Sequence, residues 1–139
     1  MKHTVTVRKN RSHRWLIRFL MLIAAILLIW IVIAFHDPLY VLVWFLPILM
    51  MSPVAIYYET WQITFSDKGI VKKVFFTKGK SFSYTQLLKV TKAFYQSEGS
   101  NCIRMHFKNG KTLQFRMDDE GAYKAEKELL KHCSIKTLS

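Results

Sequence analysis

The chain has 139 residues, of which 51% are hydrophobic, and a formal net charge of +12. This length fits one ordinary domain, and a disordered basic chain would contain far fewer apolar residues. The charge and the apolar residues lie in different segments. Residues 1–18 hold six basic and no acidic residues, residues 19–58 hold a single charged residue, Asp37, and residues 59–139 hold fifteen bases and eight acids. This segregation excludes a purely soluble protein.

Two uncharged segments, residues 19–35 and 39–58, have the length of membrane-spanning helices. A spanning helix needs about 20 mostly apolar residues. The first segment reaches that length by extending back to Trp15, with Arg18 reaching the headgroups through its long side chain. We therefore expect transmembrane helices at 15–35 and 39–58, joined by an extracytoplasmic turn at 36–38. Two soluble core helices or a cleaved signal peptide are the alternatives, and about 80 remaining residues are too few to cover two such helices.

Basic residues flank the outer ends of this predicted hairpin, and the connecting turn has no Lys or Arg. Cytoplasmic loops are the ones enriched in Lys and Arg. We therefore predict that both termini are cytoplasmic, with residues 1–14 forming a basic N-terminal arm and residues 59–139 a cytoplasmic domain.

The pattern changes to strand periodicity after Tyr58. Residues 61–66 alternate apolar and polar, and further strands are expected at 70–77, 81–84 and 90–96, with one helical turn at 85–88. In the next hairpin, a three-residue loop at 108–110 pairs Met105 with Leu113 and Ile103 with Phe115. A two-residue loop would place apolar residues opposite polar ones, so we predict the three-residue loop, with Gly110 in a left-handed bulge position.

A C-terminal helix is predicted over residues 118–132. Three acidic residues, Asp118 to Glu120, crowd its start, and basic residues follow, which suits the helix dipole. Its apolar stripe is formed by Ala122, Ala125, Leu129, Leu130 and Cys133. The N-terminal segment His3–Arg8 also alternates. We leave open whether it adds a strand to the domain or stays a disordered basic arm.

Antiparallel strands closed by one amphipathic helix, in about 80 residues, resemble the pleckstrin-homology-like (PH-like) barrel. The layout resembles small bacterial membrane proteins in which two transmembrane helices precede a bacterial PH domain. The stretches that carry this resemblance are residues 61–65, residues 81–90, the Asn109-Gly110 hairpin and the terminal helix. The resemblance implies an α-helical membrane hairpin plus an α+β domain, a PH-like antiparallel β-barrel capped by its helix, in the bacterial plasma membrane. Six strands are countable, where the full barrel has seven.

No catalytic motif, cofactor motif or metal-ligand spacing is recognisable, so we predict no enzyme activity, no cofactor and no metal. Basic residues in the first hairpins after the membrane favour contact with anionic lipids or a membrane-protein partner, and the membrane setting argues against nucleic acid. The candidate contact residues are Arg14, Arg18, Trp61, Lys68, Lys72, Lys73, Lys78 and Lys80.

We expect a non-enzymatic scaffold module, an accessory subunit of a membrane complex. The resemblance also permits an alternative role, immunity against a membrane-active peptide toxin (bacteriocin).

Overall fold

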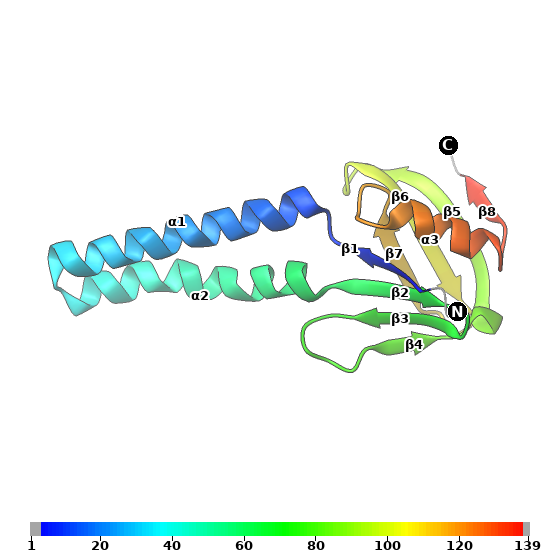
Figure 1. Cartoon of the computed structure of the whole chain (residues 1–139), viewed down its shortest axis with the longest axis horizontal. Coiled ribbons are helices and arrows are strands. Elements are labelled where there is room, and N and C mark those ends of the chain that lie inside the picture. Colours follow the sequence, from blue (N-terminus) through cyan, green and yellow to red (C-terminus); the bar gives the residue numbers. More distant parts are fainter. Residues whose placement is uncertain (1–3, 138–139) are drawn as a thin grey trace. The chain divides into compact units, whose positions relative to one another are not determined.

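The computed structural model describes residues 4–137. The first three residues of the expected N-terminal arm and residues 138–139 lie outside the described residues. The chain divides into two units, one formed by residues Arg11–Thr60 and the other by the residues on both sides of that segment. Figure 1 shows the order of their elements.

The first unit is a pair of helices, α1 (Arg11–Phe35) and α2 (Pro38–Thr60). Both are long and apolar enough to cross a membrane, and among the described residues no other helix is. Ile31 is the one buried residue of α1, and α2 has none. Helices of a soluble core would be mostly buried, so this exposure supports the predicted hairpin over two core helices.

The turn and the open ends of this helical unit are held by local polar contacts. The carboxylate of Asp37 accepts a hydrogen bond from the backbone N–H of Leu39, which caps α2. At the other end, the guanidinium of Arg18 makes two hydrogen bonds of 2.6 and 2.7 Å with the carboxylate of Glu59. This bidentate pair joins α1 to α2.

The second unit is a two-sheet domain. Its first sheet has the order β1-β2-β3-β4, formed by β1 (Val5–Arg8), β2 (Gln62–Ser66), β3 (Gly69–Lys73) and β4 (Lys80–Phe82). Its second sheet has the order β7-β6-β5-β8, formed by β5 (Leu87–Tyr95), β6 (Ser100–Phe107), β7 (Thr112–Arg116) and β8 (Ile135–Thr137). A short 3-10 helix, Tyr84–Gln86, links them. Neither sheet is closed, so the arrangement is α+β with two open sheets.

Aromatic contacts join the inner faces of the two sheets. The rings of Phe65 and Phe115 meet edge to face at 5.8 Å, and those of Phe82 and Phe107 lie 4.7 Å apart. All four side chains are buried. The helix α3 (Ala122–Leu130) adds Ala122, Ala125 and Leu129 to this core.

The N-terminal segment is a strand of this domain, which settles the alternative left open by the sequence. β1 pairs antiparallel with β2, with Val7 opposite Ile63. On its other side, Arg8 exchanges two backbone hydrogen bonds of 3.0 Å with Glu120. The helical pair is therefore inserted between two neighbouring strands of one sheet.

The predicted β6–β7 register is confirmed. Met105 pairs with Leu113 and Ile103 with Phe115, and the loop residue Gly110 has a φ of +80°. Other boundaries differ from the prediction. The strand expected over 70–77 ends at Lys73, and the short strand β8 was not predicted.

The C-terminal helix is shorter than predicted, and part of its expected apolar stripe is wrong. It begins at Ala122, because Gly121 before it has a left-handed φ of +86°. The acidic residues 118–120 therefore precede the helix instead of forming its first turn. Leu130, which was predicted to belong to the stripe, is 54% exposed, whereas Glu128, which was not, is buried.

Candidate functional site

Two lysines lie directly opposite each other on the inner side of the first sheet. Lys72 of β3 pairs with Lys80 of β4 on one side and with Ile63 of β2 on the other. Directly opposed residues of antiparallel strands point to the same face of the sheet. Ile63 is fully buried, whereas Lys72 on the same face is half-buried and Lys80 is exposed, so the core ends at this row with two positive charges.

The lysine pair lies at the end of the sheet that carries both chain connections to α1 and α2. Arg8, the last residue of β1, pairs with Gln62, the first residue of β2, which in turn pairs with Lys73, the last residue of β3. The chain enters α1 at Arg11 and leaves α2 at Thr60. We call this the connection end of the sheet.

The segment between β3 and β4, residues 74–79, forms a defined loop at this end. The hydroxyl of Thr77 donates a hydrogen bond of 2.8 Å to the carbonyl oxygen of Val74. Gly79 has a φ of +88°, and a Cβ atom there would lie 2.9 Å from the carbonyl oxygen of Lys72, so the position favours glycine. The loop and the lysine pair enclose a hollow of about 260 Å³, lined by Lys72, Val74, Phe75, Thr77, Gly79 and Lys80.

Four lysines in and beside this loop have no carboxylate partner among the described residues. Within residues 4–137, no ion pair joins Lys72, Lys73, Lys78 or Lys80 to an acidic side chain. Burial lowers the pKa of Lys72, and the nearby charges of Lys80 and Lys9 lower it further. The site is therefore suited to binding an anion.

Lys9 belongs to this cluster, although sequence reasoning did not single it out. Its ammonium lies 4.3 Å from the ring centre of Trp61. The sequence signal for it was the alternation of Val5 and Val7. In a strand, this alternation places Lys9 on the same face of the sheet as these two valines. Trp61 itself is 3% exposed, so it belongs to the core of the sheet domain.

The structure does not bring all predicted contact residues together. Lys73, next to the loop, and Lys78, within it, are exposed. Lys68 lies in the β2–β3 turn, at the opposite end of the sheet from Lys72. Arg14 and Arg18 belong to the helical unit, where Arg18 pairs with Glu59.

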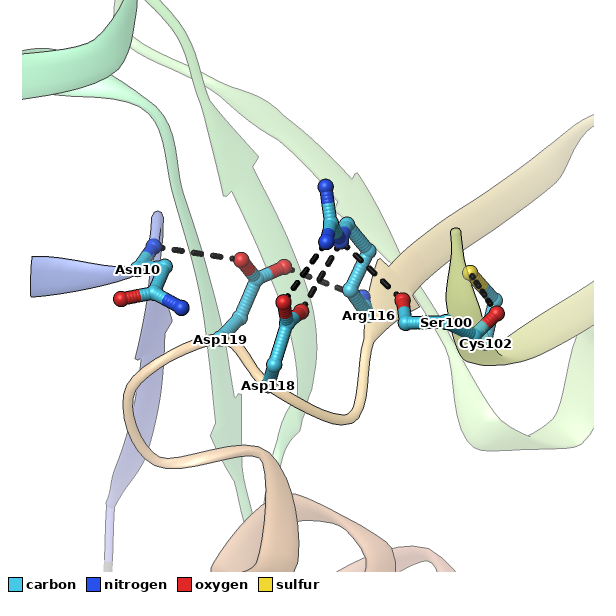
Figure 2. A network of polar contacts seen from close by, with 6 residues as sticks. All are labelled: Asn10, Ser100, Cys102, Arg116, Asp118 and Asp119. Carbon is cyan, nitrogen blue, oxygen red and sulfur yellow. Dashed lines mark hydrogen bonds and ion pairs between the residues drawn. The ribbon is translucent and has the colours of Figure 1, made fainter. Parts of the chain in front are cut away.

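A second polar cluster surrounds the buried carboxylate of Asp119, as Figure 2 shows. The two oxygens of this carboxylate accept hydrogen bonds from the backbone N–H groups of Asn10 at 3.2 Å and Arg116 at 3.0 Å. The guanidinium of Arg116 binds the Asp118 carboxylate and the hydroxyl of Ser100. Burial raises the pKa of Asp119, and the two backbone hydrogen bonds oppose that shift. This cluster fastens the residues that follow β1 to the β7–α3 turn, which is a structural role.

A third cluster lies at the end of the sheet opposite the connection end. The ring of Tyr84 stacks on that of His132 at 3.8 Å, and the buried carboxylate of Glu128 pairs with Lys131 at 3.2 Å. Burial and the charges of Glu128 and Asp67 raise the pKa of Tyr84 to about 12. Tyr84 therefore stays neutral, and the cluster holds the C-terminal end of α3.

No group of three or more potential metal ligands occurs in the part of the chain that the structure describes. The positive charge of the basic hollow at the connection end favours an anionic ligand. No protein-family model matches the chain, and no curated protein matches it either.

Proposed function

We propose that this chain is a non-enzymatic integral membrane protein whose sheet domain acts as a binding and scaffold module on the cytoplasmic membrane surface, as an accessory subunit of a membrane complex. The helical pair spans the membrane, and both chain ends lie on the cytoplasmic side. The observation that carries this proposal is the pairing of β1 with β2 across the inserted helices.

The pairing supports a hairpin that returns to the side from which it starts. Two paired strands must lie in the same compartment, so residues 5–8 and 62–66 share one side, and the intervening segment crosses an even number of times. The excess of Lys and Arg outside the turn favours the cytoplasm for that side. Two short connections, residues 9–10 and Trp61, keep the sheet domain next to the bilayer.

The strand order supports a PH-like domain. Strands β1–β4 and β5–β7 supply seven antiparallel strands in two sheets before α3, the number in the full PH-like barrel. The seventh strand, missing from the sequence count, is β1. In this interpretation the membrane hairpin occupies the connection between the first two strands of the barrel.

A protein-binding surface is supported by two exposed aromatic side chains. Phe94 and Tyr123 are 63% and 70% exposed, and both line a hollow of about 480 Å³ together with Met117. Exposed aromatic residues are enriched at protein interfaces.

The proposal is tested by photo-crosslinking in native membranes. A photoreactive phenylalanine analogue at Phe94 or Tyr123 should give a discrete adduct with one membrane protein, whereas the same analogue at the exposed Lys108 should not. Equal labelling at all three positions, or no adduct at Phe94 and Tyr123, would contradict the scaffold role.

A further inference from the structure

We propose that the lysine pair Lys72–Lys80 and the 74–79 loop form a docking surface for an anionic lipid bilayer, in which lipid phosphates bind at the lysines and Phe76 enters the headgroup region. The inference rests on the proposed membrane anchoring and names the partner of the basic hollow. It concerns a bilayer surface of negative charge, without selection of one headgroup.

Position is the first argument. The 74–79 loop leaves β3 next to Gln62, one residue after Trp61, so it emerges from the same end of the sheet as both connections to the proposed membrane hairpin. A strand rises about 3.3 Å per residue. The β3–β4 loop therefore lies at the connection end of the first sheet. The β2–β3 turn, which contains Lys68, lies at the other end of β3, about four residues or roughly 13 Å from the loop.

Charge is the second argument. Like charges directly opposite each other on neighbouring strands destabilise a sheet. Lys72 and Lys80 are nevertheless opposed, and within residues 4–137 no carboxylate forms an ion pair with either of them. A phosphate at the hollow would relieve this repulsion, and Lys73 and Lys78 add attraction to a negative surface.

The loop also carries an exposed aromatic side chain. Phe76 is 88% exposed, the largest exposed fraction among the bulky apolar side chains of the described residues. Phe75 beside it is 44% exposed and lines the hollow. Lysines precede and follow these two aromatic residues in the sequence, and interfacial segments combine basic with aromatic residues in the same way.

Inward-pointing lysines on an edge strand have another known use, which is to prevent strand addition and aggregation. Lys80 is on the edge strand β4. The two interpretations differ in their consequences. If the lysines only guard the edge, their loss promotes self-association and leaves lipid contact unchanged.

The test uses the full chain, with Cys102→Ala and Cys133→Ser, reconstituted in vesicles of phosphatidylcholine with or without phosphatidylglycerol. An environment-sensitive fluorophore is attached at Phe76→Cys, or at Lys108→Cys as the control. Lys108 is exposed, and its backbone N–H donates a hydrogen bond to the carbonyl oxygen of Gln86. Gln86 follows Phe82, the last residue of β4, so Lys108 lies away from the end of β4 that carries Lys80. Flotation of the protein with the vesicles reports the hairpin separately from the loop.

We expect nitroxide-labelled lipids to quench the fluorophore at position 76 in vesicles with phosphatidylglycerol, more weakly in pure phosphatidylcholine, and not at position 108. Lys72→Gln with Lys80→Gln should weaken the loop–lipid equilibrium, by up to about fivefold per lysine, and high salt should do the same. Lys108→Gln with Lys111→Gln removes two charges elsewhere and should have no effect.

Protein that fails to float with either vesicle would contradict the proposed membrane anchoring. Protein that floats but leaves the label at position 76 as unquenched as that at 108 would overturn the docking surface. Quenching that is unchanged by Lys72→Gln with Lys80→Gln, together with new self-association, would assign the lysines to edge protection and would also overturn it.

Discussion

The two units of this chain place the same kinds of side chain in opposite ways. In the helical unit, large apolar residues such as Ile33 and Leu39 are 64% and 69% exposed, whereas Ile63 and Phe65 of the sheet domain are completely buried. The helices satisfy their backbone hydrogen bonds internally, so they need no partner surface in a lipid environment. The sheets need a core. In the proposed membrane setting, the surroundings of the chain change from water to lipid at residues 10–11 and back to water at residues 60–61.

A charge in the sheet core should have the largest effect and should separate the units. Leu129 is completely buried, so Leu129→Asp buries a carboxylate without a partner, which costs several kcal/mol against a typical domain stability of about 5–15 kcal/mol. The sheet domain should become sensitive to limited proteolysis, while the hairpin keeps the protein in the membrane fraction.

The neighbouring leucine provides the control for that experiment. Leu130 is 54% exposed, so Leu130→Asp should change the free energy of unfolding by no more than about 0.5 kcal/mol. A protease-resistant Leu129→Asp variant, or a Leu130→Asp variant that is cleaved, would show that the face of α3 is wrongly assigned.

The contact of β1 with the rest of the sheet domain can be tested at two glycines with similar backbones. Gly121 and Gly110 have φ values of +86° and +80°, so alanine costs about 1–2 kcal/mol at either position. A Cβ atom at Gly121 would also lie 2.3 Å from the carbonyl oxygen of Thr6, whereas nothing lies within 4 Å of one at Gly110.

Gly121→Ala should therefore displace β1 and accelerate amide hydrogen exchange there, and Gly110→Ala should not. The loss of stability should be larger for Gly121→Ala, because only this variant combines backbone strain with a steric clash. Equal exchange in β1 for both variants would contradict the close approach of Gly121 to β1.

The smallest effect that we predict is a pH dependence at Asp119. Burial raises the pKa of this carboxyl above its value in the unfolded chain, about 3.9. A group with a raised folded-state pKa stabilises the fold when protonated, so its contribution is complete below about pH 3.9 and is lost as the pH rises through the folded-state pKa.

The difference in thermal midpoint between the wild-type chain and Asp119→Asn isolates this term. It should shift in favour of the variant as the pH rises across this window. A constant difference would mean that the hydrogen bonds from Asn10 and Arg116 balance burial, and a shift in favour of the wild-type chain would mean that they outweigh it.

Local patterns in the sequence were enough to predict some features. The β6–β7 register followed from alternation, because a slip of one residue reverses every side chain. The N-terminal strand could not be assigned in this way, since its four residues pair with a segment more than 50 residues away. The acidic residues 118–120 matched a helix start, yet Asp119 serves the distant backbone of Asn10.

The candidate site shows the same limit. Lys68 and Lys72 are close in sequence, but a strand of five residues places them at opposite ends of the sheet. Conversely, Lys9 lies close to Lys72 only because β1 joins the sheet. The loop at 74–79 replaces the second half of the strand predicted over 70–77, and that loop exposes Phe76.

The central claim is that a membrane hairpin is inserted between two paired strands on the cytoplasmic side. Thr6 and Thr64 lie opposite each other in β1 and β2. The most direct test replaces both with cysteine, in a chain that also carries Cys102→Ala and Cys133→Ser. A protease site is inserted at Asp37. Spheroplasts are treated with protease from outside, and their membranes are then oxidised.

We predict cleavage at the turn, with the two fragments held together by a disulfide until reductant is added. A control pair of Thr6→Cys with Thr112→Cys, on the edge strand β7 of the other sheet, should release both fragments without reductant. Fragments that separate in the Thr6–Thr64 variant after oxidation, or a turn that only protease added from the cytoplasmic side can cleave, would contradict the claim.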